Sequence, residues 1–173
     1  MKTSQVFLEE ERIIRVSETA RLADQARRAF EGDAWHGDSV LELLANVDAK
    51  TAAAHPIKGA HSIWELVLHI AAWDEAVLRR TKGSAVELSD RENFPPVEDA
   101  SDTAWRKAIE QAKEKHEALV KAVAAFPDSR LLEPVPGKKE KYYDHFYLFS
   151  GIVQHELYHA GQVGLLKKIN RLS

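Results

Sequence analysis

Four long segments of the chain place apolar residues at the spacing of one helix face, and this pattern limits the fold more than any other feature. The segments span about residues 9–30, 62–82, 102–126 and 144–172. No run alternates apolar and polar residues for long enough to predict a sheet. Because each helix must bury its apolar stripe against another helix, we expect an all-α four-helix bundle.

The 173 residues suffice for one domain with a sizeable core, so we expect a single bundle over residues 1–173. Capping boxes, in which a serine and a glutamate three residues later satisfy free backbone groups, predict two helix starts. One begins a short helix at Ser39, and the other begins the second long helix at Ser62. Glu65 completes the second box, although its place one turn before His69 also suits a carboxylate beside a metal site.

The connections between the long segments lack helical periodicity. Residues 51–59 and 131–141 contain proline and are predicted to be irregular. From Gly83 to Asp102 the pattern is absent over about twenty residues, which is long for a loop within a domain and favours a surface lid. We expect such a lid to influence the choice of substrate.

Composition argues against several classes of partner. The chain carries 24 basic and 27 acidic side chains, so its formal charge is -3 and nucleic-acid binding is not expected. Residues 1–15 contain no apolar stretch typical of a signal peptide, and no run of about 18 apolar residues predicts a membrane span. We therefore expect a cytoplasmic protein without a membrane partner.

The chain has no cysteine but eight histidines, and this imbalance directs the search for a site. The lack of cysteine excludes disulfides, cysteine-bound metals and a thiol nucleophile. A metal ion would therefore have to be held mainly by histidine, aspartate or glutamate side chains.

The strongest local motif is the run from His155 to His159, which places two histidines one helical turn apart. Side chains four residues apart on a helix lie about 5–6 Å from each other on one face, close enough to bind one metal ion. Gln162 shares this otherwise apolar face, which is expected to point into the bundle. Two buried imidazoles without partners would be costly, so a metal is the simplest way to satisfy them. The alternative is a pair of helix-face histidines without a ligand.

The same run matches the H-E-x-x-H signature of zinc metalloproteases, with Glu156 as the base. That interpretation is disfavoured because Gln162 and Leu165 stand where the extended pattern needs glycine and histidine. Glu156 also lies about 100° around the helix from His155, and no carboxylate follows His159. A third ligand must therefore come from an earlier part of the chain.

His69 is the best upstream candidate for a third ligand, because it lies in the most apolar part of the second long helix. His116, on the apolar stripe of the third long helix, ranks second. Tyr158 and Gln162 are candidates for orienting a substrate, and no general base is assigned. The other histidines fall in connections or near helix ends and are predicted to be solvated: His36, His55, His61 and His145.

Three segments of the chain resemble the DinB-like/YfiT-like superfamily of metal-dependent four-helix-bundle enzymes. Residues 151–163, GIVQHELYHAGQV, are similar to the family's H-x-x-x-H-x-G-Q segment. Residues 62–73, SIWELVLHIAAW, resemble its single-histidine helix, and residues 35–44, WHGDSVLELL, resemble its preceding short helix. Residues 83–99 and the third long helix carry no motif of the family.

The resemblance implies an up-down-down-up bundle with a divalent metal held by His69, His155 and His159, the residues that face geometry also favours. Members of the family are often homodimers, so a homodimer is expected here, and the relatives of this family include thiol-dependent S-transferases, a maleylpyruvate isomerase and proteins assigned as hydrolases. Three imidazoles leave a coordination position open for water or substrate, as in catalytic sites. Zinc or nickel is the expected ion, while iron and manganese also accept this ligand set.

Two functions are therefore expected from the sequence. The first is a metal-dependent hydrolase or thiol-dependent S-transferase acting on a small molecule. Any thiol would come from a low-molecular-weight cosubstrate, because the chain has no cysteine. The second is a non-enzymatic bundle that binds a small molecule or a partner and uses its histidines as a polar core.

Overall fold

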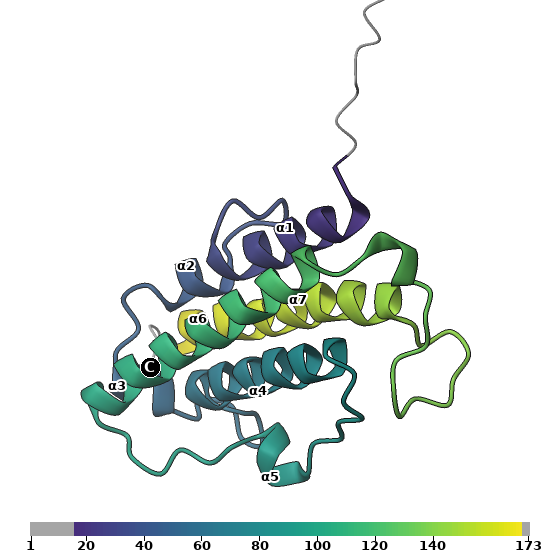
Figure 1. Ribbon diagram of the computed structural model, residues 1–173. Helices are drawn as coiled ribbons and strands as arrows, with labels where there is room; N and C mark the ends of the chain where they lie inside the picture. The colour runs from purple at the N-terminus through teal and green to yellow at the C-terminus, as the bar shows by residue number, and fades with distance from the viewer. Residues whose placement is uncertain (1–15, 171–173) are drawn as a thin grey trace, which may run out of the picture.

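The computed structural model describes residues 16–170, and the elements within this range are helical, with no strand among them. Figure 1 shows α4 and α6 running in one direction and α1 and α7 in the opposite one, which is the up-down-down-up order. The all-α four-helix bundle predicted from the sequence is therefore confirmed. Its long helices are α1 (Glu18–Glu31), α4 (Ile63–Thr81), α6 (Asp102–Ala124) and α7 (His145–Asn170).

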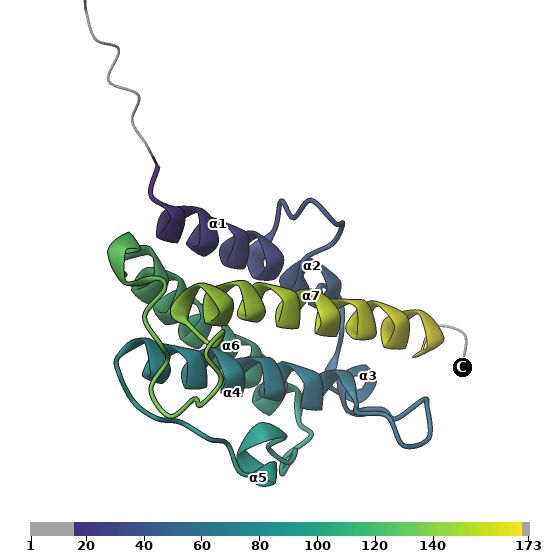
Figure 2. The same ribbon diagram turned by 90° about the vertical axis from the view of Figure 1, so that its right-hand side faces the viewer.

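Helices α6 and α7 each pack against both α1 and α4, as the two views of the bundle show (Figure 2). Buried apolar side chains form two large clusters along the bundle. One cluster contains Ile70 and Trp105, and the other contains Val77 and Leu119. Among residues 16–170, no helix combines the length and the apolar content that a membrane crossing requires.

Short helices occupy the connections: α2 (Val40–Leu44), α3 (Ala49–Ala53), α5 (Asp90–Asn93) and the 3-10 helix η1 (Asp128–Arg130). The sequence predicted only the first of these, so α3 and α5 correct the expectation that residues 51–59 and 83–102 are irregular throughout. In both cases a side chain caps a helix too short for periodicity to reveal, Asp48 for α3 and Ser89 for α5.

The first helix begins later than the sequence predicts. The Ser17 side chain accepts a hydrogen bond from the Ala20 amide and caps α1, so the helix starts at Glu18 rather than near residue 9. Val16, expected on the apolar stripe, precedes the helix and is exposed. Residues 9–15 of the predicted first helix and residues 171–172 of the predicted last helix lie outside the described residues.

The α4–α6 connection, residues 82–101, is fixed to the bundle at several points. Arg80 is buried and donates hydrogen bonds to the Val86 carbonyl at 2.7 and 3.2 Å. Further along, the Trp73 indole nitrogen donates to the Asn93 side-chain oxygen at 2.8 Å. These bonds hold α5 and the residue after it, Phe94, against α4 at the level of His69.

Candidate metal centre

His69 of α4 and the pair His155 and His159 of α7 come together inside the bundle. One ring nitrogen of each lies within 4.8 Å of the other two. The Nε2 atoms of His69 and His155 are only 2.9 Å apart. His69 and His159 are buried and His155 is half-buried. The structure thus brings together the three residues that the sequence selects as metal ligands, and we call them the histidine cluster.

Hydrogen bonds fix which nitrogen of two rings faces the centre of the histidine cluster. His69 Nδ1 lies 2.7 Å from the Asn93 carbonyl oxygen, which can only accept, so Nδ1 carries the hydrogen and Nε2 keeps its lone pair. His159 Nδ1 donates to Gln162 Oε1 at 2.9 Å, which selects the same tautomer. Metal-binding histidines characteristically make such a bond with the nitrogen that faces away from the ion. Gln162, a candidate for orienting a substrate, instead orients a histidine.

The short contact between His69 and His155 requires either a hydrogen atom or a cation between the two Nε2 atoms, since two lone pairs would repel each other. Since the His69 lone pair is fixed, either His155 donates its own Nε2 hydrogen or a cation binds both lone pairs. His155 Nδ1 is buried and has no hydrogen-bond partner in the described part of the chain. The convergent lone pairs of neutral imidazoles are a donor set that fits zinc, nickel, iron or manganese.

Burial keeps the histidine cluster neutral. It lowers the pKa of His69 to about 4, against the opposing effect of the bond to the Asn93 carbonyl. Burial also lowers the pKa of His155 to about 3, and the neighbouring rings of His159 and His69 add to the effect. The pKa of His159 is lowered for the same main reason. Neutral imidazole is the form that binds a metal, so these rings are ready to bind at neutral pH.

The α4–α6 connection contacts the histidine cluster directly. The Phe94 ring stacks on the His69 ring with a centroid distance of 4.0 Å and on the His61 ring at 3.7 Å. Since Asn93 supplies the carbonyl that orients His69, two successive residues of this connection are in contact with one candidate metal ligand. The predicted lid therefore contributes to the site itself.

Glu65 acts as a helix cap, one of the two roles that the sequence left open. Its Oε2 accepts a hydrogen bond from the Ser62 amide at 2.8 Å and lies 3.1 Å from His55 Nε2 and 3.4 Å from His61 Nδ1. The carboxylate is therefore engaged by three groups that do not belong to the histidine cluster.

An apolar cavity of about 160 Å³ lies beside His155. Its walls include the aromatic rings of Trp73, Tyr143 and Tyr147, and His155 forms part of the lining. Behind these walls, the Arg80 guanidinium lies over the Trp73 ring at 5.4 Å and 3.5 Å from the Tyr143 hydroxyl. A ligand in this cavity would contact the histidine cluster through His155.

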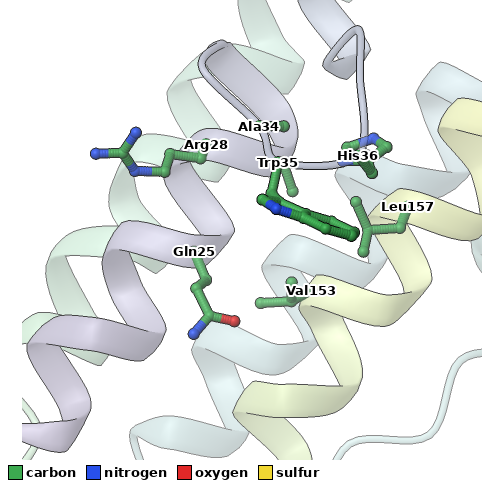
Figure 3. A pocket seen from close by; sticks show the side chains of 8 residues that line it. Gln25, Arg28, Ala34, Trp35, His36, Val153 and Leu157 are labelled. Carbon is green, nitrogen blue, oxygen red and sulfur yellow. The ribbon is translucent and has the colours of Figure 1, made fainter.

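Another cavity, of about 200 Å³, lies between α1 and α7 (Figure 3). Trp35 is fully exposed, and its ring lies across this cavity toward Val153 and Leu157 of α7. No member of the histidine cluster lines this cavity. The cavity beside His155 is therefore the better candidate for a substrate pocket.

A second polar cluster, which the sequence analysis missed, lies in the core of the bundle. Glu156 Oε1 is 3.1 Å from His116 Nδ1, and Asp74 Oδ2 is 3.2 Å from the same nitrogen. His116, ranked second as a metal ligand beside His155, thus faces two carboxylates instead. We call Asp74, His116 and Glu156 the acidic cluster. Three features of the sequence pointed to this cluster. They are an aspartate within an apolar helix, a histidine on an apolar stripe, and the position of Glu156, about 100° around the helix from His155.

The acidic cluster shifts pKa values in the opposite direction to the histidine cluster. Burial raises the pKa of Asp74 and raises that of Glu156 to about 8, where the neighbouring Asp74 charge adds to the effect. For His116 burial opposes protonation, but the two carboxylates outweigh it and raise its pKa to about 10. The cluster therefore favours bound positive charge.

One prediction about the remaining histidines is wrong. His145 is buried at the start of α7, where its Nδ1 donates to the Glu133 carbonyl at 2.9 Å and its ring packs on Phe126. The loop before α7 folds back over this helix end, which periodicity could not reveal. His36, His55 and His61 are exposed, as predicted. Tyr158, the other candidate for orienting a substrate, is 65% exposed.

A comparison with known protein families supports the geometry. The model of the DinB superfamily matches residues 34–163, well over half of the chain, and the histidine cluster falls within this span. Comparisons with curated proteins and with solved structures gave no match. The family match, the up-down-down-up bundle and the convergence of three histidines agree with one another, and the chain belongs to the DinB superfamily.

Proposed function

We propose that this protein is a metal-dependent enzyme that transfers a low-molecular-weight thiol to a small electrophilic molecule. The observation that carries the proposal is the convergence of His69, His155 and His159 as neutral imidazoles beside an apolar cavity. A divalent ion held by these residues supplies a Lewis acid that lowers the pKa of a thiol or a water molecule.

The chain's own residues prepare the site for such an ion. The Asn93 carbonyl and the Gln162 side chain hold the imidazole tautomers, and Phe94 covers one face of His69. Trp73 and Tyr143 offer apolar and aromatic surface to the part of the substrate that does not react. The cavity volume of about 160 Å³ suits a group of small size.

The positions of the carboxylates favour a thiol over water as the nucleophile. Glu156 faces His116 and Asp74, and Glu65 is engaged by Ser62 and two exposed histidines. A water nucleophile gains from a general base, whereas a thiol loses its proton to solvent readily once its pKa is lowered. In the proposed reaction the thiol sulfur forms a bond to an electrophilic carbon, the leaving group departs with its bonding electrons, and the thiol proton passes to solvent.

The test combines elemental analysis with an activity screen. His69→Ala, His155→Ala and His159→Ala should each leave the protein with one divalent ion fewer than the unsubstituted chain, while helical content is kept. His36→Ala, which changes an exposed histidine outside the cluster, is the matched control. Conjugation of glutathione or cysteine to an aryl halide should depend on the ion and disappear in His155→Ala.

Two results would decide against the proposal. Full metal content in the three cluster variants would show that these histidines do not hold the ion. Ion-dependent hydrolysis of an aryl ester without any thiol-dependent activity would assign the protein to the hydrolases instead.

A further inference from the structure

The acidic cluster joins three helices at one point in the core. Asp74 comes from α4, His116 from α6 and Glu156 from α7, and all three are 0% exposed. One ligand-type atom of each lies within 4.8 Å of the other two. Side chains of this kind are rarely buried without a compensating partner, so their satisfaction has to be accounted for atom by atom.

Hydrogen bonding within the cluster leaves most carboxylate oxygens unsatisfied. His116 Nδ1 carries at most one hydrogen and bonds to Asp74 Oδ2. Glu156 Oε1 lies 3.1 Å from the same nitrogen, so the two carboxylates compete for its single hydrogen. Asp74 Oδ1 and both oxygens of Glu156 are buried without a hydrogen-bond partner in the described range. A buried carboxylate that lacks donors is strongly unfavourable unless a cation balances it.

The two distances measured from His116 Nδ1 match the spacing of neighbouring ligands around a metal ion. Two ligand atoms about 2.1 Å from an ion, at an angle of about 100°, lie roughly 3.2 Å apart. The distances from His116 Nδ1 to Asp74 Oδ2 and Glu156 Oε1 are 3.2 and 3.1 Å. The unpaired second oxygens of both carboxylates can bind the same ion, which would satisfy them as well.

We infer that Asp74, His116 and Glu156 form a second, structural binding site for a divalent cation. A divalent ion would replace the proton that His116 holds in the metal-free cluster. With the imidazole then neutral, the ion would balance the two negative charges of the carboxylates. Mixed oxygen and nitrogen ligands suit manganese, iron or zinc. Because the cluster is buried and draws its ligands from three helices, the ion would hold α4, α6 and α7 together, as closed metal sites do.

The test first removes two histidines of the histidine cluster, so that only the inferred site can bind a metal ion. The double variant His155→Ala/His159→Ala is refolded from urea with Mn²⁺ or Zn²⁺, because the buried site would load slowly in the folded protein. After desalting, elemental analysis should find one ion per chain. Adding Asp74→Asn should remove that ion, whereas adding Glu75→Gln, which changes the exposed neighbouring carboxylate, should leave it in place.

A second measurement does not depend on the stability of these variants. A crystal of the unsubstituted protein refolded with Mn²⁺ should show an anomalous scattering peak between Asp74 and Glu156. The absence of that peak, or a folded double variant without any ion, would overturn the inference and show that protons balance these carboxylates.

The outcomes separate this inference from the proposed function. One ion in the unsubstituted protein that disappears in the double variant overturns the second site and leaves the histidine site standing. One ion that remains in the double variant supports the second site and argues against the histidine site. Two ions in the unsubstituted protein and one in each set of variants support both.

Discussion

The histidine cluster and the acidic cluster share helices α4 and α7 but place opposite demands on their surroundings. In the histidine cluster, burial lowers the pKa values of the imidazoles, a hydrogen bond to a backbone carbonyl orients the His69 ring, and a cavity borders His155. In the second, burial is complete and the neighbouring charges raise the pKa of His116. Adjacent residues, His155 and Glu156, belong to different clusters. The 100° turn between neighbours on a helix is enough to separate an accessible centre from a sealed one.

The acidic cluster also lies between the two large apolar clusters along the bundle. On α6, His116 lies between Ala112 of one apolar cluster and Leu119 of the other. On α7, Glu156 lies between Ile152 and Ala160, which belong to different apolar clusters too. A polar layer between two apolar ones favours a single register of the helices, since any shift would bury charge against apolar surface.

The largest difference between the clusters should appear in the stability of the metal-free protein. His116→Ala leaves two buried carboxylates facing each other and should lower the free energy of unfolding by about 3–5 kcal/mol. His159→Ala leaves a cavity and an unpaired half-buried glutamine but no unpaired charge, so it should cost less, about 2 kcal/mol. Urea unfolding in the presence of a chelator measures both values. Equal losses would abolish the distinction between the clusters.

Added metal should act on the accessible cluster alone once the protein has folded. Zn²⁺ given to chelator-treated protein at a hundred times its dissociation constant should raise the free energy of unfolding by about 2.7 kcal/mol. His69→Ala should abolish this gain, whereas His116→Ala should keep it despite the lower starting stability. Thermal unfolding with and without Zn²⁺ provides the measurement. A gain that survives in His69→Ala would move the exchangeable site elsewhere.

Loss of the hydrogen bond between His159 and Gln162 should have a smaller effect, which is confined to the affinity of the histidine cluster for metal. Gln162→Met keeps the length of the side chain but removes the acceptor, so affinity for Zn²⁺ should fall roughly 10- to 100-fold. Gln154→Met changes an exposed glutamine on the same helix and should leave the affinity unchanged. Titration calorimetry compares the two variants. Unchanged affinity in Gln162→Met would mean that the observed bond does not orient the ligand.

The dependence of stability on pH should have opposite signs for the two clusters. Unfolded histidine has a pKa of 6.5, and folded His69 has a pKa of about 4. The unfolded chain therefore binds more protons between these values, and the histidine cluster loses stability as pH falls below 6.5. Folded His116 has a pKa of about 10, so its contribution is lost as pH rises from 6.5 toward 10.

Urea midpoints of the metal-free protein across this pH range test both signs. His155→Ala, which removes another ring of low pKa, should flatten the acid side of the profile and leave the alkaline side unchanged. An unaltered acid side would show that the histidine cluster titrates as it does in the unfolded chain.

Much of this arrangement could be predicted because it rests on local patterns. Periodicity predicted the long helices, capping boxes located two helix starts, and the spacing of His155 and His159 selected the face that meets His69. The ion, the thiol cosubstrate and the homodimer stay predictions.

The parts that could not be predicted depend on contacts between distant elements. The partner of His69 is a backbone carbonyl, which every residue possesses and which leaves no signature in the sequence. The meeting of Asp74, His116 and Glu156 depends on how three helices are rotated against one another. Taken alone, the aspartate within an apolar helix and the histidine on an apolar stripe do not indicate that they meet each other.

The bond from His69 to the Asn93 carbonyl has a consequence for how such a site can diversify. Substitution of the Asn93 side chain keeps the backbone carbonyl but removes the bond to Trp73 that holds this segment, whereas a change in the length of the α4–α6 connection moves the carbonyl itself. An insertion between residues 82 and 93 would alter the wall over the site and the orientation of a ligand in one step. Loop length is therefore a simple variable by which evolution or design could change the substrate range and the metal affinity of the proposed enzyme together.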